Sequence, residues 1–347
     1  MNTKIKKYSI GILGVRGYVG QELLAIIAHH PMLSLNWVSS RQLAGQPVSA
    51  ICSNYCDKEP LLIESLSPEN VAAKNTDIVV LALPNGLAFE YVKALELSGN
   101  QQIIIDLSAD YRFNPDWHYL VPEINNLKQG KQLGQSIKIS NPGCYATAMQ
   151  LAIAPIKDLL ATRPNCFGVS GYSGAGTTPN PNNDMQRLTD NLVAYKTVEH
   201  LHEKEVTRHL DMEISFTPHV SQFFRGINMT IQLEFNFPVA KSVIENRFVD
   251  YYSMHPLVEY QESIPTLKEV VNTPKAVIGG LTISQDRKRG TIICCLDNLL
   301  KGAASQAIQN INLAIGQHST LGLVDSFEFN PLIAKQDLNV ALAGAKQ

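Results

Sequence analysis

Hydrophobic and polar positions follow two different patterns along the chain. In the first part, short apolar runs typical of buried strands alternate with segments of helical periodicity. The expected strands are 8–13, 33–39, 77–83 and 102–107, and the expected helices are 18–30 and 89–97. Apolar strands alternating with helices predict a parallel sheet covered on both faces, hence an α/β domain.

The pattern changes near residue 144. A helix is expected over 144–160, because Tyr145, Met149 and Ile156 recur on one helical face. Longer strands then follow with few helices between them. The expected elements are strands at 166–172, 213–217, 228–235, 276–284 and 291–296, a polar loop at 177–183, and helices at 242–255 and 301–313. This succession predicts a largely antiparallel sheet in an α+β second domain.

Length and charge narrow the class of protein. A chain of 347 residues favours two domains, and 45% hydrophobic with 17% charged residues excludes a disordered chain. The net charge of -2 argues against nucleic acid or a membrane surface as the main partner. No apolar run approaches the roughly 20 residues that span a bilayer, and the N-terminus is interpreted as a first strand rather than a signal peptide. We expect a cytoplasmic protein that acts on small molecules.

A glycine-rich turn follows the first strand. Gly14, Gly17 and Gly20 lie between that strand and an expected helix, which is the context a dinucleotide site requires. Gly11 or Gly14 would allow the tight turn, Gly17 the approach of phosphate, and Gly20 close packing of the helix. N–H groups at the helix start would hold the pyrophosphate. A plain strand–turn–helix is the alternative.

The end of the second strand distinguishes the two nicotinamide cofactors. A site for NAD usually has an acidic residue there to bind the ribose hydroxyls. This chain has Ser39, Ser40 and Arg41 instead. Hydroxyls and a guanidinium suit the 2′-phosphate of NADP, although Arg41 could also be an ordinary surface residue. The sequence therefore favours NADP.

Cys144 stands immediately before an apolar helix, after Asn141, Pro142 and Gly143. The positive end of a helix stabilises a thiolate over a thiol, and Pro142–Gly143 suits a turn that exposes the sulfur. Cys144 is therefore a candidate nucleophile that could accept an acyl group. The other five cysteines are expected to be reduced, mostly buried thiols. Cys52 and Cys56 lack the second ligand pair of a zinc site.

A general acid–base group is expected near this nucleophile. His219, at the end of a strand, is the leading candidate, and Arg225 follows it. The rival is the segment from Glu199 to Glu205, which contains His200 and His202. Nothing completes a ligand set around those histidines, so we expect no metal.

Several motifs in one order resemble the N-acetyl-gamma-glutamyl-phosphate reductase family. The resemblance covers nearly the whole chain. Its motifs include Gly14-x-x-Gly17-Tyr18-x-Gly20, residues 81–86, residues 106–112, Pro122-Glu123, residues 140–147, residues 170–176, residues 191–196, residues 216–219, Arg225-Gly226 and residues 296–304. The sequence departs from the family pattern at Arg16, at Asn85 and after Gly176, which leaves the substrate's chain length and acyl group open.

The resemblance implies a fold, an activity and site residues. It implies a Rossmann domain from 1–143 and 298–347, and a catalytic and oligomerisation domain from 144–297 of the glyceraldehyde-3-phosphate dehydrogenase type. It implies a homodimer or homotetramer, with Cys144 as nucleophile and His219 as acid–base partner. The implied NADP contacts are Gly11, Gly14, Arg16, Gly17, Tyr18, Ser39, Ser40, Arg41, Pro84, Ser173, Gly174 and Asn298, and the implied contacts of the acyl-phosphate substrate are Arg112, Asn141, Ser173, Glu205 and Arg225.

The expected reaction is NADPH-dependent reduction of N-acetyl-gamma-glutamyl phosphate to the semialdehyde, through a thioester on Cys144, in arginine biosynthesis. In it, Arg112 would match the charge of the departing phosphate, and Arg225 would be free to hold a substrate carboxylate. The first alternative is the same chemistry on an aminoadipyl or aspartyl phosphate derivative. A regulatory protein that senses NADP has no need of the nucleophile, and a cysteine hydrolase leaves the glycine turn unexplained.

Overall fold

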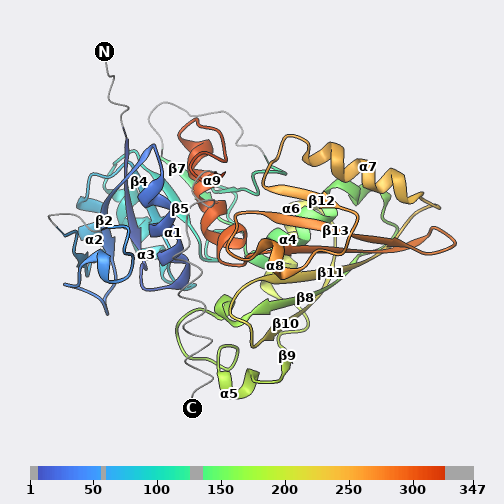
Figure 1. Cartoon of the computed structure of the whole chain (residues 1–347). Coiled ribbons are helices and arrows are strands. Elements are labelled where there is room, and N and C mark those ends of the chain that lie inside the picture. The colour runs from blue at the N-terminus through green and yellow to red at the C-terminus, as the bar shows by residue number, and fades with distance from the viewer. Residues whose placement is uncertain (1–6, 56–59, 126–135, 325–347) are drawn as a thin grey trace. The chain divides into compact units, whose positions relative to one another are not determined.

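The computed structural model describes residues 7–55, 60–125 and 136–324. They form two compact units (Figure 1). The first runs to Gly143 and is completed by Ala303–Gly322, and the second runs from Cys144 to Gly302. Residues 298–302, together with Leu323 and Val324, are assigned to the first domain by the family resemblance but fall in the second unit, and 325–347 lie outside the described residues.

The first unit is built on a seven-stranded sheet in which every pairing is parallel, with the order β3-β2-β1-β4-β5-β7-β6. Its strands are β1 (Tyr8–Leu13), β2 (Leu33–Ser39), β3 (Ile63–Glu64), β4 (Ile78–Leu81), β5 (Ile103–Asp106), β6 (His118–Tyr119) and β7 (Ile137–Ser140). The helices are α1 (Tyr18–His29), α2 (Pro68–Ala73), α3 (Ala88–Leu97) and α9 (Ser305–Ala314), with a 3-10 turn at Val48–Ala50. Strand order reverses between β1 and β4, which is where open α/β sheets bind ligands.

The sequence predicts the long elements of this unit well. The strands expected at 8–13 and 33–39 have those bounds in the structure, and β4 and β5 are slightly shorter than expected. All residues of β4 and β5 are buried, as a sheet covered on both faces requires. The elements β3, β6, β7 and α2 were not predicted. They have only two to six residues with polar positions among them, and so show no clear periodicity.

The second unit contains a mixed seven-stranded sheet with the order β12-β13-β14-β11-β8-β10-β9. Its strands are β8 (Asn165–Gly171), β9 (Leu192–Ala194), β10 (Ser215–Ser221), β11 (Ile227–Glu234), β12 (Val258–Gln261), β13 (Ala276–Ile283) and β14 (Arg289–Leu296). The pairs β8–β10 and β12–β13 are parallel, and the other four pairings of the described strands are antiparallel. The largely antiparallel sheet is thereby confirmed.

Helix α4 (Cys144–Ile153) packs against β11, β14 and α6 (Leu201–Leu210). All its residues from Tyr145 onward are buried, which accounts for its apolar composition. The helix is shorter than the predicted 144–160. Pro155 has no N–H to continue the helical hydrogen bonds, and the chain tightens into a 3-10 helix at Ala154–Leu159.

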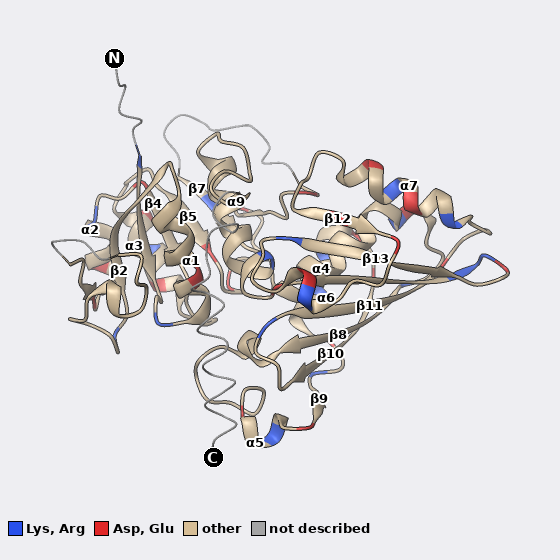
Figure 2. Cartoon of the chain, viewed as in Figure 1, with Lys and Arg blue, Asp and Glu red and all other residues tan. Residues whose placement is uncertain are grey.

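The remaining helices of the second unit are α5 (Met185–Leu188), α7 (Lys241–Tyr252) and α8 (Leu267–Val270), with a 3-10 turn at Tyr172–Ala175. Along α7, charges of both signs are interspersed (Figure 2), and Lys241 pairs with Glu245 one turn later at 3.4 Å. The expected helix at 301–313 is in two parts, a π-helical segment at Leu300–Ala304 and then α9. Among the described residues, no helix is long and apolar enough to cross a membrane.

Candidate active site

The glycine turn after β1 has the backbone of a phosphate-binding loop. Gly14 has a positive φ of 90°, and a Cβ there would lie 2.1 Å from the carbonyl oxygen of Ala82. Gly17 caps α1 without a side-chain hydrogen bond. The first N–H groups of α1 therefore point out of the helix start without a side-chain acceptor from the cap, in the arrangement that binds anions.

The two outer glycines of this segment have packing roles. A Cβ on Gly20 would lie 2.6 Å from the carbonyl oxygen of Gly14, so Gly20 lets α1 begin directly against the turn. Gly11 lies inside β1, where a Cβ would overlap the ring of Trp37. Of the two candidates for the tight turn, Gly14 makes it and Gly11 accommodates Trp37.

Replacing Gly14 with alanine is expected to damage the first unit. The new Cβ meets a backbone oxygen and the residue must hold a left-handed φ, so the free energy of unfolding should fall by about 2 kcal/mol or more. Thermal unfolding followed by circular dichroism would measure this. The exposed Gly86, also at positive φ but with nothing within 4 Å of its Cβ, is the matched control, and Gly86→Ala should cost less. Equal losses in the two variants would contradict the clash.

At the end of β2, the three predicted NADP residues differ in exposure. Ser39 is buried, and its Oγ accepts a hydrogen bond from Leu66 N at 3.2 Å. Ser40 is also buried, whereas Arg41 is exposed and has no hydrogen bond or ion pair with any described residue. Of the three residues, Arg41 is therefore the one whose side chain is exposed to a ligand.

An acidic residue that the sequence interpretation missed lies beside this strand end. Glu64, on β3, is the register partner of Ser39. Both of its carboxylate oxygens accept from Lys74 Nζ, at 2.7 and 2.9 Å. The ion pair with Lys74 offsets the negative charge of this carboxylate. Glu64 comes 25 positions after Ser39, and only the pairing of β2 with β3 reveals it.

Other predicted residues of the first unit are held mainly by the backbone. Arg112 is buried, and its guanidinium donates to the carbonyl oxygens of Asn141 and Leu107, both at 3.0 Å. Asn141 is buried as well; its Oδ1 accepts from Asn310 on α9 at 3.0 Å. Pro84 is exposed at the end of β4. The structure therefore brings Arg112 and Asn141 together, whereas Pro84 lies in the loop after β4.

In the second unit, Cys144 begins α4. Of the five described cysteines it alone is not buried, and none is in a disulfide. Cys56 lies outside the described residues. A helix start stabilises a thiolate through the N–H groups that lack an intrahelical partner. Gly302 lies against this residue, and a Cβ there would be 2.7 Å from the Cβ of Cys144. The predicted nucleophile is thus accessible and its surroundings are closely packed.

The predicted cofactor residues of the second unit form one cluster. Asn298 Nδ2 donates to Ser173 Oγ at 2.9 Å, and a Cβ on Gly174 would lie 3.6 Å from the same Nδ2. Asn298 Oδ1 accepts from Gly226 N at 2.6 Å. Ser173 and Asn298 are buried, and Gly174 is exposed. Ser173 and Asn298, 125 positions apart in the sequence, therefore meet just after the ends of β8 and β14.

Arg225 does not match its predicted role. Its Nε lies 2.7 Å from Asp297 Oδ2, and the two side chains are 3% and 0% exposed. Its Nη2 donates to Oδ1 of the same carboxylate at 3.2 Å. The expectation that Arg225 is free to hold a substrate carboxylate is therefore corrected. A buried guanidinium needs an anionic partner within the fold, and here Asp297 supplies it.

His219 lies on the face of the second sheet opposite α4. A Cβ on Gly168 would lie 2.6 Å from the ring of Tyr145, so Gly168 and its register partner Pro218 face α4. Because strand side chains alternate, His219 faces the other way. Its ring packs on Phe167, with centroids 4.4 Å apart. Its backbone oxygen accepts a hydrogen bond from Tyr145 Oη at 2.6 Å. The predicted pairing of His219 with Cys144 is therefore corrected.

The rival histidines do lie on the α4 side. The ring of His202 is 6.0 Å from that of Tyr145, the neighbour of Cys144, and His200 packs edge-on against Tyr145 at 6.4 Å. His200 caps α6: its Nδ1 accepts from His202 N at 3.1 Å. His202 Nε2 lies 3.7 Å from Oε1 of Glu205, which is fully buried. The predicted substrate residue Glu205 is thus a partner of His202.

Tyr195 interacts electrostatically with Cys144 and packs against His200. Burial raises the pKa of Tyr195 well above its usual value, and nearby Cys144 raises it further. The ring of Tyr195 lies 5.7 Å from that of His200. Burial, and next the charge of Lys196, lowers the pKa of His200 to about 4, so His200 is neutral near pH 7. Among the described residues, no group of three or more His, Cys, Asp or Glu is arranged to hold a metal ion.

Comparison with known proteins agrees with this architecture. Residues 9–132 match the family model for the semialdehyde dehydrogenase NAD binding domain, and residues 144–298 match that for the semialdehyde dehydrogenase dimerisation domain. Aspartate semialdehyde dehydrogenase II of Vibrio cholerae, solved with ASA, has a similar fold: TM-score 0.72 at 17% identity, over 90% of this chain and 99% of that one. The enzyme from Candida albicans, solved with NADP, gives a TM-score of 0.70 at 16% identity, over 93% and 99%.

The fold and the domain matches define an enzyme of the semialdehyde dehydrogenase class, with a nicotinamide-cofactor domain and a dimerisation domain. Among curated relatives, the N-acetyl-gamma-glutamyl-phosphate reductase of Xanthomonas campestris pv. campestris (strain B100) is 48% identical over 312 residues, which is 90% of this chain and 97% of that protein. The reductase of Xylella fastidiosa (strain M23) is 47% identical over 309 residues, 89% and 93% of the two chains. The chain belongs to the N-acetyl-gamma-glutamyl-phosphate reductase family.

Proposed function

We propose that this enzyme reduces N-acetyl-gamma-glutamyl phosphate to N-acetylglutamate 5-semialdehyde with NADPH, as a step of arginine biosynthesis. The observation that carries the proposal is the accessible Cys144 at the start of α4, in a chain 48% identical to a reductase of that name. In this reaction an acyl phosphate carbon is attacked, phosphate leaves, and the acyl group is reduced to an aldehyde.

Cys144 performs the covalent step. Its thiolate attacks the acyl carbon, the new C–S bond replaces the C–O bond to phosphate, and inorganic phosphate leaves. N–H groups at the start of α4 are donors for the oxyanion that forms on the acyl oxygen. A nicotinamide cofactor, when bound, would supply the hydride that takes the thioester to the aldehyde level. Collapse to aldehyde then breaks the C–S bond and returns the thiolate.

His202 is our candidate for the proton transfers. Two observations support this role: its ring lies 6.0 Å from that of Tyr145, the neighbour of Cys144, and the carboxylate of buried Glu205 lies 3.7 Å from its Nε2, where it can stabilise the protonated imidazole. His200 has Nδ1 committed as an acceptor, so its neutral ring carries a proton on Nε2. We assign His200 the role of fixing the start of α6 and His202 that of general acid and base.

The residues present fit a nicotinamide dinucleotide. The turn at Gly14 leaves no space for a Cβ, and Gly17 leaves the N–H groups of α1 without a side-chain cap. Gly14, Arg16, Gly17 and Tyr18 would hold the pyrophosphate, and Ser173, Gly174 and Asn298 the nicotinamide end. The preference for NADPH rests on Arg41, which is exposed and without an ion pair among the described residues.

Arg41→Ala is expected to weaken NADPH binding and leave NADH binding little changed. A charged hydrogen bond to the 2′-phosphate is lost, so the Kd for NADPH should rise about tenfold or more. Fluorescence titration with each cofactor measures this. Lys93→Ala, at an exposed site on α3, is the control. A wild-type enzyme that binds both cofactors equally would overturn the preference.

The substrate is tested by phosphate-dependent NADP reduction with three aldehydes: N-acetylglutamate semialdehyde, N-acetylaminoadipate semialdehyde and aspartate semialdehyde. We expect the highest kcat/KM with the first. Faster turnover of either other aldehyde would replace the proposed substrate and keep the thioester chemistry.

We further propose that the enzyme works in the cytoplasm as a homodimer or homotetramer. The match of residues 144–298 to a dimerisation domain supports self-association. Light scattering of the purified protein would give the number of subunits, and a monomeric mass at micromolar concentration would contradict it.

A further inference from the structure

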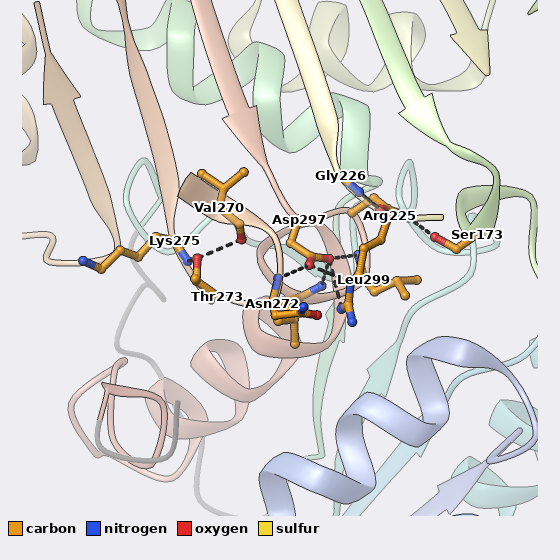
Figure 3. A network of polar contacts seen from close by, with 11 residues as sticks. Ser173, Arg225, Gly226, Val270, Asn272, Thr273, Lys275, Asp297 and Leu299 are labelled. Carbon is orange, nitrogen blue, oxygen red and sulfur yellow. Dashed lines mark hydrogen bonds and ion pairs between the residues drawn. The ribbon is translucent and has the colours of Figure 1, made fainter. Parts of the chain in front are cut away.

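Asp297 is a buried carboxylate to which the mechanism above gives no role. It directly follows β14 and is 0% exposed. Figure 3 shows Arg225 and Asn272 converging on it from two other segments of the second unit. The guanidinium of Arg225 contacts both carboxylate oxygens, at 2.7 and 3.2 Å.

Three backbone N–H groups share the same carboxylate. Asn272 N donates to Oδ2 at 2.8 Å, and Leu299 N and Leu300 N donate to Oδ1 at 2.9 and 3.2 Å. Leu299 and Leu300 belong to the turn that directly follows Asp297, so the Asp297 side chain also holds the backbone of this turn in place. Five polar contacts on one buried carboxylate hold three segments of the chain together, namely the residues before β11, after α8 and after β14.

The segments held in this way carry the predicted site residues. Asn298, the next residue, donates to Ser173 and accepts from Gly226 N, which follows Arg225. The carbonyl oxygen of Asp297 accepts from Gly302 N at 2.8 Å. Gly302 in turn lies against Cys144 so closely that no Cβ would fit on Gly302. The position of this turn therefore determines where Asn298 lies and how closely the chain packs on the nucleophile.

We propose that Asp297 is the positioning residue of the active site, which sets the place of Asn298 on the cofactor side and of Gly302 beside Cys144. The inference rests on the proposed function, since it takes Asn298 as a cofactor contact and Cys144 as the nucleophile. Asp297 acts through Arg225 and the turn at 298–302.

A carboxylate is needed here because every neighbour is a donor. An asparagine has one accepting oxygen, and its amide N–H groups would face either the guanidinium of Arg225 or backbone N–H groups. It also removes the anion that compensates the buried Arg225. Removing Arg225 is different, because Asp297 then keeps its three backbone donors. The structure therefore predicts that the two halves of this ion pair are not equivalent.

The test compares Asp297→Asn, Arg225→Met and the exposed control Asp250→Asn on α7 in the full-length enzyme. Two properties are measured that need no substrate: the Kd for the nicotinamide cofactor, and the rate of alkylation of Cys144 by iodoacetamide between pH 6 and 9. For Asp297→Asn we expect the Kd to rise about tenfold. We also expect the pH midpoint of alkylation to shift, and kcat to fall about 10²-fold from misplaced groups.

For Arg225→Met we expect smaller changes in Kd and in alkylation than for Asp297→Asn, and Asp250→Asn should match the wild type. Kd and alkylation within twofold of the wild type in Asp297→Asn, or larger changes in Arg225→Met, would overturn the proposal.

Should Asp297→Asn not fold, Asp297→Glu keeps the charge but displaces the accepting oxygens. If Asp297→Glu had the Kd and the alkylation profile of the wild type, the proposal would be overturned as well. Failure of the wild type to turn over N-acetylglutamate semialdehyde would count against the proposed function instead, because neither readout uses that substrate.

Discussion

Replacing Cys144 with serine is expected to lower phosphate-dependent turnover at least about 10³-fold, with cofactor affinity unchanged. The hydroxyl of serine has a pKa far above that of a thiol, so the start of α4 cannot hold it as an anion near neutral pH. The side chains are nearly the same size, and the packing of Gly302 against position 144 should therefore survive. The loss is then one of nucleophilicity rather than of structure.

The measurement is the initial rate of NADP reduction with N-acetylglutamate semialdehyde and phosphate, together with a cofactor titration of the same preparation. Cys52→Ser is a matched control, because Cys52 lies in the first unit. That variant should keep activity within about twofold of the wild type, because Cys52 is not the proposed nucleophile. More than a tenth of wild-type turnover in Cys144→Ser would be incompatible with a thioester at this position.

Local signals predict the parts of the site that are contiguous in sequence. The turn at Gly14 and the nucleophile Cys144 each lie between an element and the start of a helix, and both are found there. The cofactor-side cluster and the ion pair of Arg225 with Asp297 could not be predicted in the same way. Their members are 72 or more positions apart and meet only because β8, β11 and β14 are neighbours in one sheet.

For the acid–base group, the residues around His219 carry an informative sequence signal. Phe216, Pro218 and Val220 alternate as apolar residues, and all three are buried in the structure. In a strand with period two, that alternation already assigns His219 to the opposite face. The signal for the rival pair was weaker. His200 and His202 share a face only in a strand, whereas the structure places His200 at the cap of α6 and His202 in its first turn.

His202→Asn is accordingly expected to lower kcat by about 10²- to 10⁴-fold, the usual contribution of a general acid–base group, while the Kd for NADPH stays the same. Asparagine preserves a polar side chain of moderate size next to Glu205 and Tyr145 but cannot carry the proton. Because Cys144 is untouched, its alkylation by iodoacetamide should persist, which separates loss of proton transfer from loss of the nucleophile.

His219→Asn is the matched control, since the same substitution is made on the opposite face of the same sheet. Its backbone oxygen still accepts from Tyr145, so the position of the residue after Cys144 is kept. We expect kcat within a few-fold of the wild type, because the imidazole faces away from α4, at whose start Cys144 lies. Steady-state kinetics of both variants decide the assignment. A large loss in His219→Asn with little change in His202→Asn would return the acid–base role to His219 and would require its side chain to reach the α4 face.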